Sequence, residues 1–243
     1  KGAGDWEHFV IHDTHYLAVA NMYDGSTDQL DSEVFKWDGG KFVSVQLIPT
    51  TGGRDWEHFV IGGTHYLVVA NQFDGSTYQI NSEVFKWDGS KFVSFQLIPT
   101  FGAHDWKHFE MDGSHYLAVA YYFNDVTYRV DSEVFKWNGS QLVSVQQIPT
   151  VGALDWEHFV IDGSHFLAVS NQFDDSNYNL NSEVFKWDGS KFVSFQLIPT
   201  VGATHFKHFV MNNTRYIAVA NYQDGTAHQL NSKIFTWNGV CFM

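Results

Sequence analysis

The sequence has one cysteine, four prolines, few positive charges and no long apolar run. The single cysteine, Cys241, excludes an intramolecular disulfide framework. We expect it to be a buried strand residue, and a bridge between two chains is the alternative. Because no apolar run approaches the ~20 residues that span a bilayer, no membrane insertion is expected.

Positive charge is scarce: 14 Lys and Arg stand against 27 Asp and Glu, which gives a net charge of −13. A surface this acidic repels phosphate backbones and anionic lipids, so we expect no nucleic-acid partner. It favours cations and neutral or basic partners. The chain opens KGAGDW, already inside the repeat described next, and no signal peptide is recognised in it.

The chain does contain an internal repeat with a period of 50 residues. The pattern DWEHF at 5–9 returns at 55–59 and 155–159, as DWKHF at 105–109, and as HFKHF at 205–209. We therefore expect one domain, 1–243, built from five repeats at about 5–54, 55–104, 105–154, 155–204 and 205–243.

Each repeat predicts four short strands. In the second repeat these are 56–61, 65–71, 82–87 and 91–98, and the Asp88-Gly89 pair is a strong hairpin signal. Four strands in a unit of ~40–50 residues are typical of a β-propeller blade. Large apolar residues on both faces of the predicted strands suit a sheet held between two neighbours. The prediction is an all-β, five-bladed propeller, with a parallel β-helix as the disfavoured alternative.

The fifth repeat ends at Cys241-Phe242-Met243, where its fourth strand would only begin. A blade without most of that strand has a bare edge, and bare edges pair with other chains. Three arrangements follow: a five-bladed ring with one short blade, a homodimer through that edge, or a fragment of a longer protein. We favour the first.

The runs DWEHFVI, SHYLAVAN, SEVFKW and IPT resemble the EAR repeat, also called EPTP, over nearly the whole chain. This family includes the leucine-rich glioma-inactivated proteins and large cell-surface receptors. The resemblance implies a secreted, non-enzymatic propeller used for recognition. Such domains usually have seven repeats, whereas this chain has five.

Four aspartates begin the first strand of the first four repeats: Asp5, Asp55, Asp105 and Asp155. If these strands line a central channel, the carboxylates converge there and favour a hard cation such as Ca²⁺. The alternative, which we favour, is that each aspartate caps a local turn through backbone N–H groups. No cofactor is required by either interpretation.

One histidine recurs in all five repeats: His8, His58, His108, His158 and His208. A ring of metal-binding or pH-sensing histidines is one hypothesis. A half-buried histidine that makes a fixed hydrogen bond between blades is the favoured one, because blades hold equivalent residues apart.

The loop after the second strand brings an amide, an aromatic ring and a carboxylate together within four residues. A ring face and nearby hydroxyl-binding groups suit a neutral sugar. An ordinary Asx-type turn is the alternative. The predicted ligand-binding residues are Asn21, Tyr23, Asp24, Asn71, Phe73, Asp74, Asn171, Phe173, Asp174, Asn221, Tyr222 and Asp224.

No sequence motif of a hydrolase, metalloprotease, nucleotide-binding enzyme or dithiol oxidoreductase occurs, so we expect no enzyme. The function expected is a multivalent, lectin-like protein with one shallow site per blade or blade junction. The alternative is a cell-surface adhesion module with one asymmetric site for a protein. A purely structural repeat protein is a third hypothesis.

Overall fold

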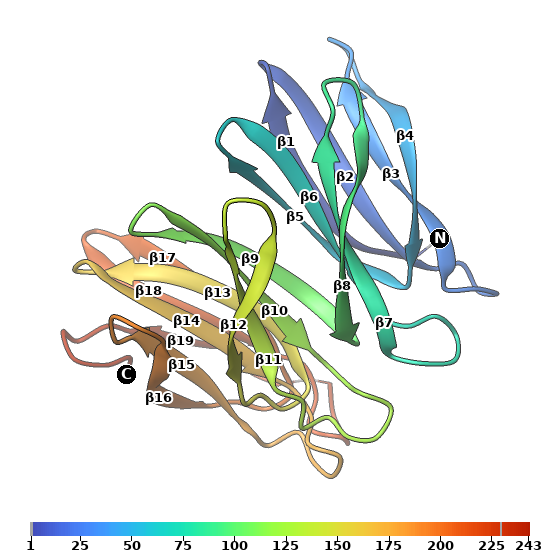
Figure 1. Ribbon diagram of the computed structural model, residues 1–243. Coiled ribbons are helices and arrows are strands. Elements are labelled where there is room, and N and C mark those ends of the chain that lie inside the picture. Colours follow the sequence, from blue (N-terminus) through green and yellow to red (C-terminus); the bar gives the residue numbers. More distant parts are fainter. Residues whose placement is uncertain (1, 229) are drawn as a thin grey trace.

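The computed structural model describes residues 2–228 and 230–243 and contains strands but no helix over those residues (Figure 1). Five antiparallel sheets follow one another in chain order, four of four strands and the last of three. The all-β, five-bladed propeller predicted from the repeats is confirmed, and so is the truncated last blade. Among these residues there is no helix long and apolar enough to cross a membrane.

The blades have closely similar strand bounds. The first two comprise β1 (Gly2–Ile11), β2 (Thr14–Tyr23), β3 (Gln29–Trp37) and β4 (Phe42–Thr51), then β5 (Gly53–Ile61), β6 (Thr64–Asn71), β7 (Gln79–Trp87) and β8 (Phe92–Phe101). The third and fourth comprise β9 (Ala103–Met111), β10 (Ser114–Tyr121), β11 (Ser132–Trp137) and β12 (Leu142–Ile148), then β13 (Ala153–Ile161), β14 (Ser164–Asn171), β15 (Asn181–Trp187) and β16 (Phe192–Pro199). The fifth comprises β17 (Ala203–Met211), β18 (Thr214–Asn221) and β19 (Lys233–Thr236).

The first two strands of each blade are joined by a two-residue turn. In the fourth blade Asp162 and Gly163 both have positive φ, 49° and 77°, as a type I′ hairpin requires. These turns form one end of the molecule, which we call the hairpin rim. The longer loops between second and third strands lie at the opposite end, which we call the loop rim (Figure 1).

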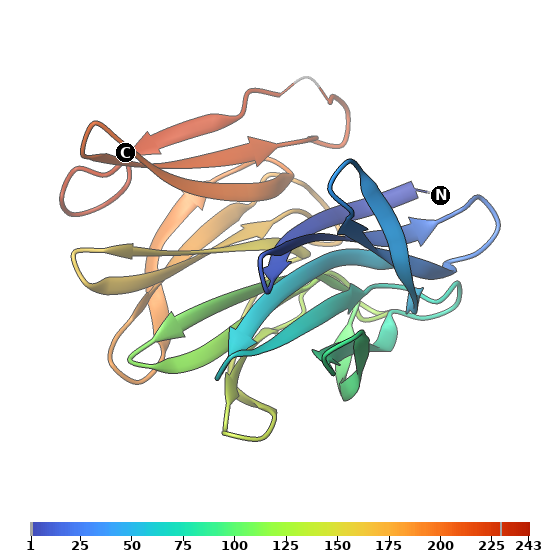
Figure 2. The ribbon, with the colours of Figure 1, turned by 90° about the horizontal axis from the view of Figure 1, so that it is seen from above.

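The hydrophobic core is divided into four parts, each between two neighbouring blades. Between the second and third blades, for example, Phe59 and Tyr66 pack in one cluster with Trp106, Leu117 and Val119. A stacked ring pair recurs at every such junction: Phe9 on His58, Phe59 on His108, Phe109 on His158 and Phe159 on His208, with centroids 4.6–5.3 Å apart. Figure 2, seen from above, shows the blades succeeding one another in the order of the chain.

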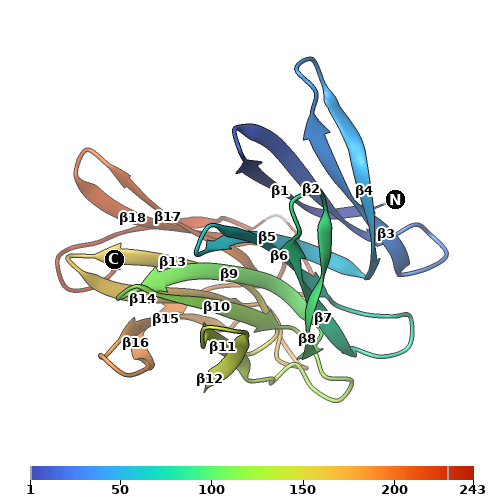
Figure 3. The same ribbon diagram turned by 45° about the horizontal axis from the view of Figure 1, so that its top comes forward.

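The fifth and first blades lack such a core over the described residues. Trp6 is 54% exposed, whereas its counterparts Trp56, Trp106 and Trp156 are each 1% exposed. On the fifth blade Met211 is 53% exposed, whereas its counterparts Ile11, Met111 and Ile161 are each 2% exposed. Figure 3 shows β1–β4 and β17–β18 on opposite sides of β5, β9 and β13.

The last blade keeps only the start of its fourth strand. Trp237 and Phe242 form an isolated bridge, and the Gln196 amide clasps Phe242 by accepting from its N–H and donating to its C=O at 2.9 and 2.7 Å. The same glutamine clasp joins the other neighbouring blades, as with Gln46 and Phe92. Cys241 lies in the turn before this bridge and is only half-buried, so its predicted place in a buried strand is wrong.

A glycine in each connector between blades fixes how the chain passes under the loop rim. Gly152 has φ of 54°, and a Cβ there would lie 2.6 Å from the Phe173 carbonyl oxygen. Its N–H donates to Tyr128 O, and its carbonyl accepts from Gln172 N. Only glycine tolerates both the conformation and this close approach. The connector therefore anchors the loops of two blades at once.

Candidate functional site

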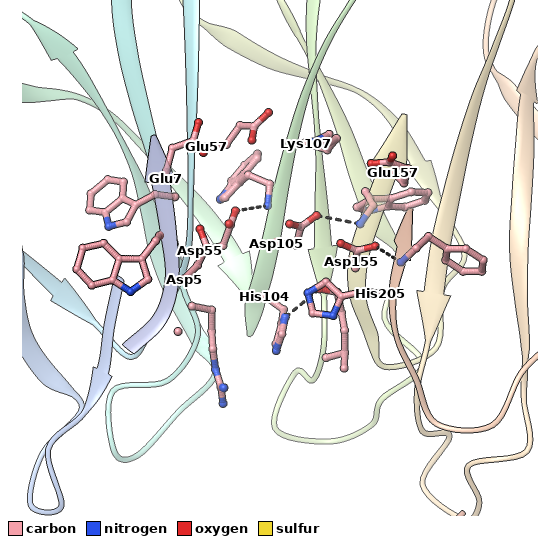
Figure 4. Close-up of a pocket in the computed structure, with 18 of the residues that line it drawn as sticks. Asp5, Glu7, Asp55, Glu57, His104, Asp105, Lys107, Asp155, Glu157 and His205 are labelled. Carbon is pink, nitrogen blue, oxygen red and sulfur yellow. Dashed lines mark hydrogen bonds between the residues drawn. The ribbon is translucent and has the colours of Figure 1, made fainter. Parts of the chain in front are cut away.

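The first strands of all five blades line a central cavity of about 330 Å³ (Figure 4). In the first, second and fourth blades an aspartate and a glutamate two residues apart lie on the face that the first strand turns toward the next blade, and in the third blade Lys107 takes the place of the glutamate. Figure 4 shows the four predicted aspartates, Asp5, Asp55, Asp105 and Asp155, in a row along the wall, with Glu7, Glu57 and Glu157 on one side of them. The four aspartates therefore line the central channel, as the cation hypothesis required.

Most of these carboxylates accept a hydrogen bond from a backbone N–H of the following blade. Asp55 accepts from Trp106 at 2.8 Å, Asp105 from Trp156 at 2.9 Å and Asp155 from Phe206 at 2.7 Å. Glu7, Glu57 and Glu157 do the same for the backbone N–H of the next histidine, at 2.8–3.2 Å. Three of the four aspartates thus bind backbone N–H groups, but across the junction between blades and not within the local turn that the favoured interpretation predicted.

The channel carries its own counterion, Lys107. Burial and the nearby carboxylates raise the pKa of Asp55 and Asp105 well above the ordinary value. Burial alone would lower the pKa of Lys107, but the carboxylates of Glu57 and Asp105 outweigh it and raise that pKa. The ammonium therefore stays charged among the acids. Over the described residues no three of the channel carboxylates bring an oxygen atom each within 4.8 Å of the other two, so a channel cation stays a prediction.

The recurring histidines pair within a blade. His8 Nε2 lies 3.0 Å from His15 Nδ1, and His58 and His158 make the same 3.0 Å contact with His65 and His165. Contact with the neighbouring blade is the ring stacking described above. His58 is half-buried as the favoured hypothesis held, but the predicted side-chain hydrogen bond between blades is wrong, because its partner His65 lies in the same blade.

The four predicted loop asparagines hold the backbone together. Asn71 donates to Asn81 O at 2.9 Å and accepts from Thr51 N at 3.0 Å. Asn171 and Asn221 form the equivalent pairs of bonds, and Asn21 donates to Asp31 O at 2.7 Å. Because these amides are already bonded to backbone groups, their part in the structure is to tie a loop to its connector.

The predicted loop carboxylates shape the turns. Asp74 Oδ1 accepts from Ser76 N, Ser76 Oγ and Thr77 N at 2.7–2.8 Å, an Asx-type turn. These bonds, first of all the one from the Ser76 hydroxyl, lower the pKa of Asp74. Asp24, Asp174 and Asp224 repeat the arrangement. Asp24 is exposed, whereas Asp74, Asp174 and Asp224 are half-buried and Asp174 also accepts from Arg129 Nη2 at 2.9 Å. The Asx-type turn is present at all four aspartates, and sugar binding by these loops stays a prediction.

Aromatic rings interlock along the loop rim from the second blade to the fourth. Tyr78 lies between Phe73 and Phe123, with centroids 4.5 and 5.1 Å away. Tyr128 likewise lies between Phe123 and Phe173, at 4.5 and 4.9 Å. The predicted ring Phe173 is thus half-buried in an aromatic row. At the first junction the counterpart of these tyrosines is Asp28, which is too small to fill the same space.

A hollow of about 380 Å³ opens on the loop rim at that first junction. Its walls include the predicted residues Tyr23 and Phe73, and Tyr78 closes one side. Polar groups come from Asp28, Gln72 and Arg54, whose Nε donates to Gln72 Oε1 at 2.6 Å. Of the predicted rings, Tyr23 and Tyr222 are the most open, 41% and 49% exposed.

The sequence did not identify Asp28 or Arg54 as site residues. The signal was present: the first repeat reads STDQL where the second reads STYQI, and Arg54 is replaced by His, Leu or Thr in the later repeats. The effect of these two substitutions depends on which aromatic rings meet across a junction between blades, and only the fold shows which rings these are.

The EPTP domain matches this chain five times, at 1–38, 41–88, 91–138, 141–188 and 191–238. Proteins of mouse and human named "Thrombospondin-type laminin G domain and EAR repeat-containing protein" are 43% and 41% identical to it over 51 residues. Each of these matches covers 21% of this chain and 8% of the relative, so only a small part of the relatives' length is compared.

Solved structures with this fold include glycosidases. The α-L-arabinofuranosidase of Lactobacillus brevis superposes with a TM-score of 0.60 at 14% identity, covering 98% of this chain and 91% of that one. The GH43_1 enzyme of Xanthomonas citri, complexed with xylotriose, gives 0.56 at 13% identity, covering 99% and 90%. At such low identity the likeness shows a shared fold alone.

Proposed function

This chain is a member of the EPTP domain family, and on that basis we propose that it is a secreted, non-enzymatic recognition propeller that binds carbohydrate in the hollow between its first two blades. The observation that carries the proposal is the hollow itself. It forms where Asp28 stands in place of the tyrosine that plugs the next two junctions.

The lining has the two chemistries that a sugar needs. Tyr23 and Phe73 offer ring faces for the apolar C–H patch of a pyranose. Asp28 and Gln72 offer oxygens and N–H groups for its hydroxyls. The bond between Arg54 and Gln72 holds both polar side chains in place before a ligand arrives, which lowers the cost of ordering them.

A glycan array followed by calorimetry tests this proposal, with xylo-oligosaccharides and galacto-oligosaccharides among the probes. The matched variant is Asp28→Tyr, which installs the tyrosine of the neighbouring junctions and fills the hollow. Binding should be abolished while the fold is retained. Undiminished binding by Asp28→Tyr, or silence across a broad array, would rule out carbohydrate binding in this hollow.

Stoichiometry distinguishes the versions of this function. One hollow predicts one sugar per chain, whereas the sequence-based expectation of a site in every blade predicts several. The single asymmetric position also favours the alternative, a cell-surface protein as ligand. An array without hits, together with cell-surface binding that Asp28→Tyr abolishes, would support that alternative.

We propose no catalytic role for the channel acids, although related folds include glycosidases. Asp55, Asp105 and Asp155 are each committed to a backbone N–H, and Lys107 lies among them. Aryl xylosides and arabinosides should therefore not be hydrolysed. A homodimer through the edge strand β19 stays a prediction, and light scattering during gel filtration tests it.

A further inference from the structure

One blade differs from the others on the face of its first hairpin. The histidine pair of the third blade is His108 and His115, and residue 110 between them in sequence is glutamate. The other repeats have valine there: Val10, Val60, Val160 and Val210. Glu110 lies opposite His115 in the ladder between β9 and β10, two residues beyond His108 on the same strand. Because side chains alternate along a strand, all three lie on one face of the sheet.

Two of the three distances among these side chains are close to those between neighbouring ligands of one metal ion. His108 Nε2 and His115 Nδ1 are 3.2 Å apart, and Glu110 Oε1 is 3.5 Å from His115 Nδ1. One ligand atom from each residue lies within 4.8 Å of the other two, the only such group among the described residues. Tetrahedral ligands at ~2.1 Å from zinc are about 3.4 Å apart.

We propose that His108, Glu110 and His115 form a binding site for a transition-metal dication, with Zn²⁺ as the fitting ion. Two imidazoles and one carboxylate suit Zn²⁺, Co²⁺ or Cu²⁺ and disfavour Ca²⁺ and Mg²⁺. Three protein ligands leave a fourth position open. The Glu110 side chain is 60% exposed, so that position faces solvent at the hairpin rim.

The surroundings prepare the ligands. The Phe59 ring of the preceding blade stacks on His108 at 5.3 Å and fixes its orientation. The 3.2 Å contact of this pair is longer than the 3.0 Å contacts of the three pairs that lack the glutamate.

The repeat supplies matched variants for the test. Glu110→Val restores the residue of the other blades and leaves the histidine pair unchanged. Val160→Glu places a carboxylate opposite His165 in the fourth blade, in the same register as Glu110 and His115. Both positions lie on the surface, so both variants should fold. His115→Gln removes a second ligand independently.

Calorimetry with Zn²⁺ on metal-free protein should give one tight equivalent for the unaltered chain and two for Val160→Glu. Glu110→Val and His115→Gln should each weaken binding at least ~100-fold, the upper end of what loss of a supporting residue costs. The Co²⁺ complex should show the visible absorption of a low-coordinate ion, absent in Glu110→Val. Equal binding by Glu110→Val, or no tight equivalent in the unaltered chain, would overturn the proposal, as would a single equivalent in Val160→Glu.

Discussion

The repeat allows one substitution to be made in two environments, and this tests whether the fifth blade covers the first. Trp106 is 1% exposed between the second and third blades, whereas Trp6 is 54% exposed on the first blade. Replacing each by alanine removes the same atoms. The difference in cost between Trp106→Ala and Trp6→Ala therefore reports the packing of the junction.

The expected difference follows from the buried surface. The two side chains differ by about half of their surface, roughly 100 Å² of a ring that buries up to ~250 Å². At ~25 cal/mol per Å² this is about 2.5 kcal/mol. Trp106 Nε1 also donates to Val69 O at 3.2 Å, a bond that contributes about 1 kcal/mol. Trp106→Ala should therefore cost about 3–4 kcal/mol more than Trp6→Ala.

Urea unfolding followed by far-ultraviolet circular dichroism measures both costs without relying on tryptophan fluorescence. Trp56→Ala is the control, because Trp56 is also 1% exposed but its Nε1 has no hydrogen-bond partner among the described residues. It should cost about 1 kcal/mol less than Trp106→Ala. Equal losses for Trp6→Ala and Trp106→Ala would show that Trp6 is covered in solution, and the open junction would be refuted.

The channel and the loop rim support four further predictions. Burial, with a smaller effect of Glu57, raises the pKa of Glu7 from 4.5 to about 7, so the folded state gains stability as the pH falls from about 7 to about 4.5. The urea midpoint of Glu7→Gln should not rise over this pH range as that of the unaltered chain does. Equal rises in the two proteins would contradict the assignment of the raised pKa to Glu7. Asp125→Gly copies Gly75 of the second blade and removes the bonds from Thr77 Oγ1 and Tyr78 N, so the Tm should fall by roughly 2–4 °C in calorimetry. Lys107→Gln should lower the Tm most at low salt, because it removes the positive charge beside Glu57 and Asp105 and their repulsion is then screened least. EDTA should leave the Tm of a chain without the zinc ligands unchanged, and a drop of several degrees would reveal a channel cation.

The strands could be predicted from the sequence because their signals are local. Asp88-Gly89 turns, alternating apolar residues and a constant period identify four strands per repeat without knowledge of the neighbours. The missing fourth strand of the last blade is equally visible in the sequence. The side-chain amide of Gln196 holds Phe242 in place. Because Gln196 lies 46 residues earlier in the chain, this contact could not be predicted from the sequence.

The candidate sites depend on contacts between repeats, and the sequence of a single repeat does not predict such contacts. Asp55 looks like a turn cap until the fold shows its oxygen on Trp106 N, 51 residues later. Glu110 is one substitution among many until the register places it opposite His115. Departures from the repeat were the useful signal, because each marks a place where the common packing is replaced by something specific.

All the junctions between neighbouring blades have the same head-to-tail orientation. Each blade offers a phenylalanine and carboxylates, and the next offers a histidine ring and backbone N–H groups. Such a head-to-tail contact has no symmetry axis of its own, so blades add in one sense only, as subunits do in a heterologous assembly. His205 and Lys207 hold the carboxylate positions of the fifth repeat. The face of this blade that is turned away from the fourth blade therefore lacks the carboxylate acceptors that every other blade extends to its successor, and the series of head-to-tail contacts stops there.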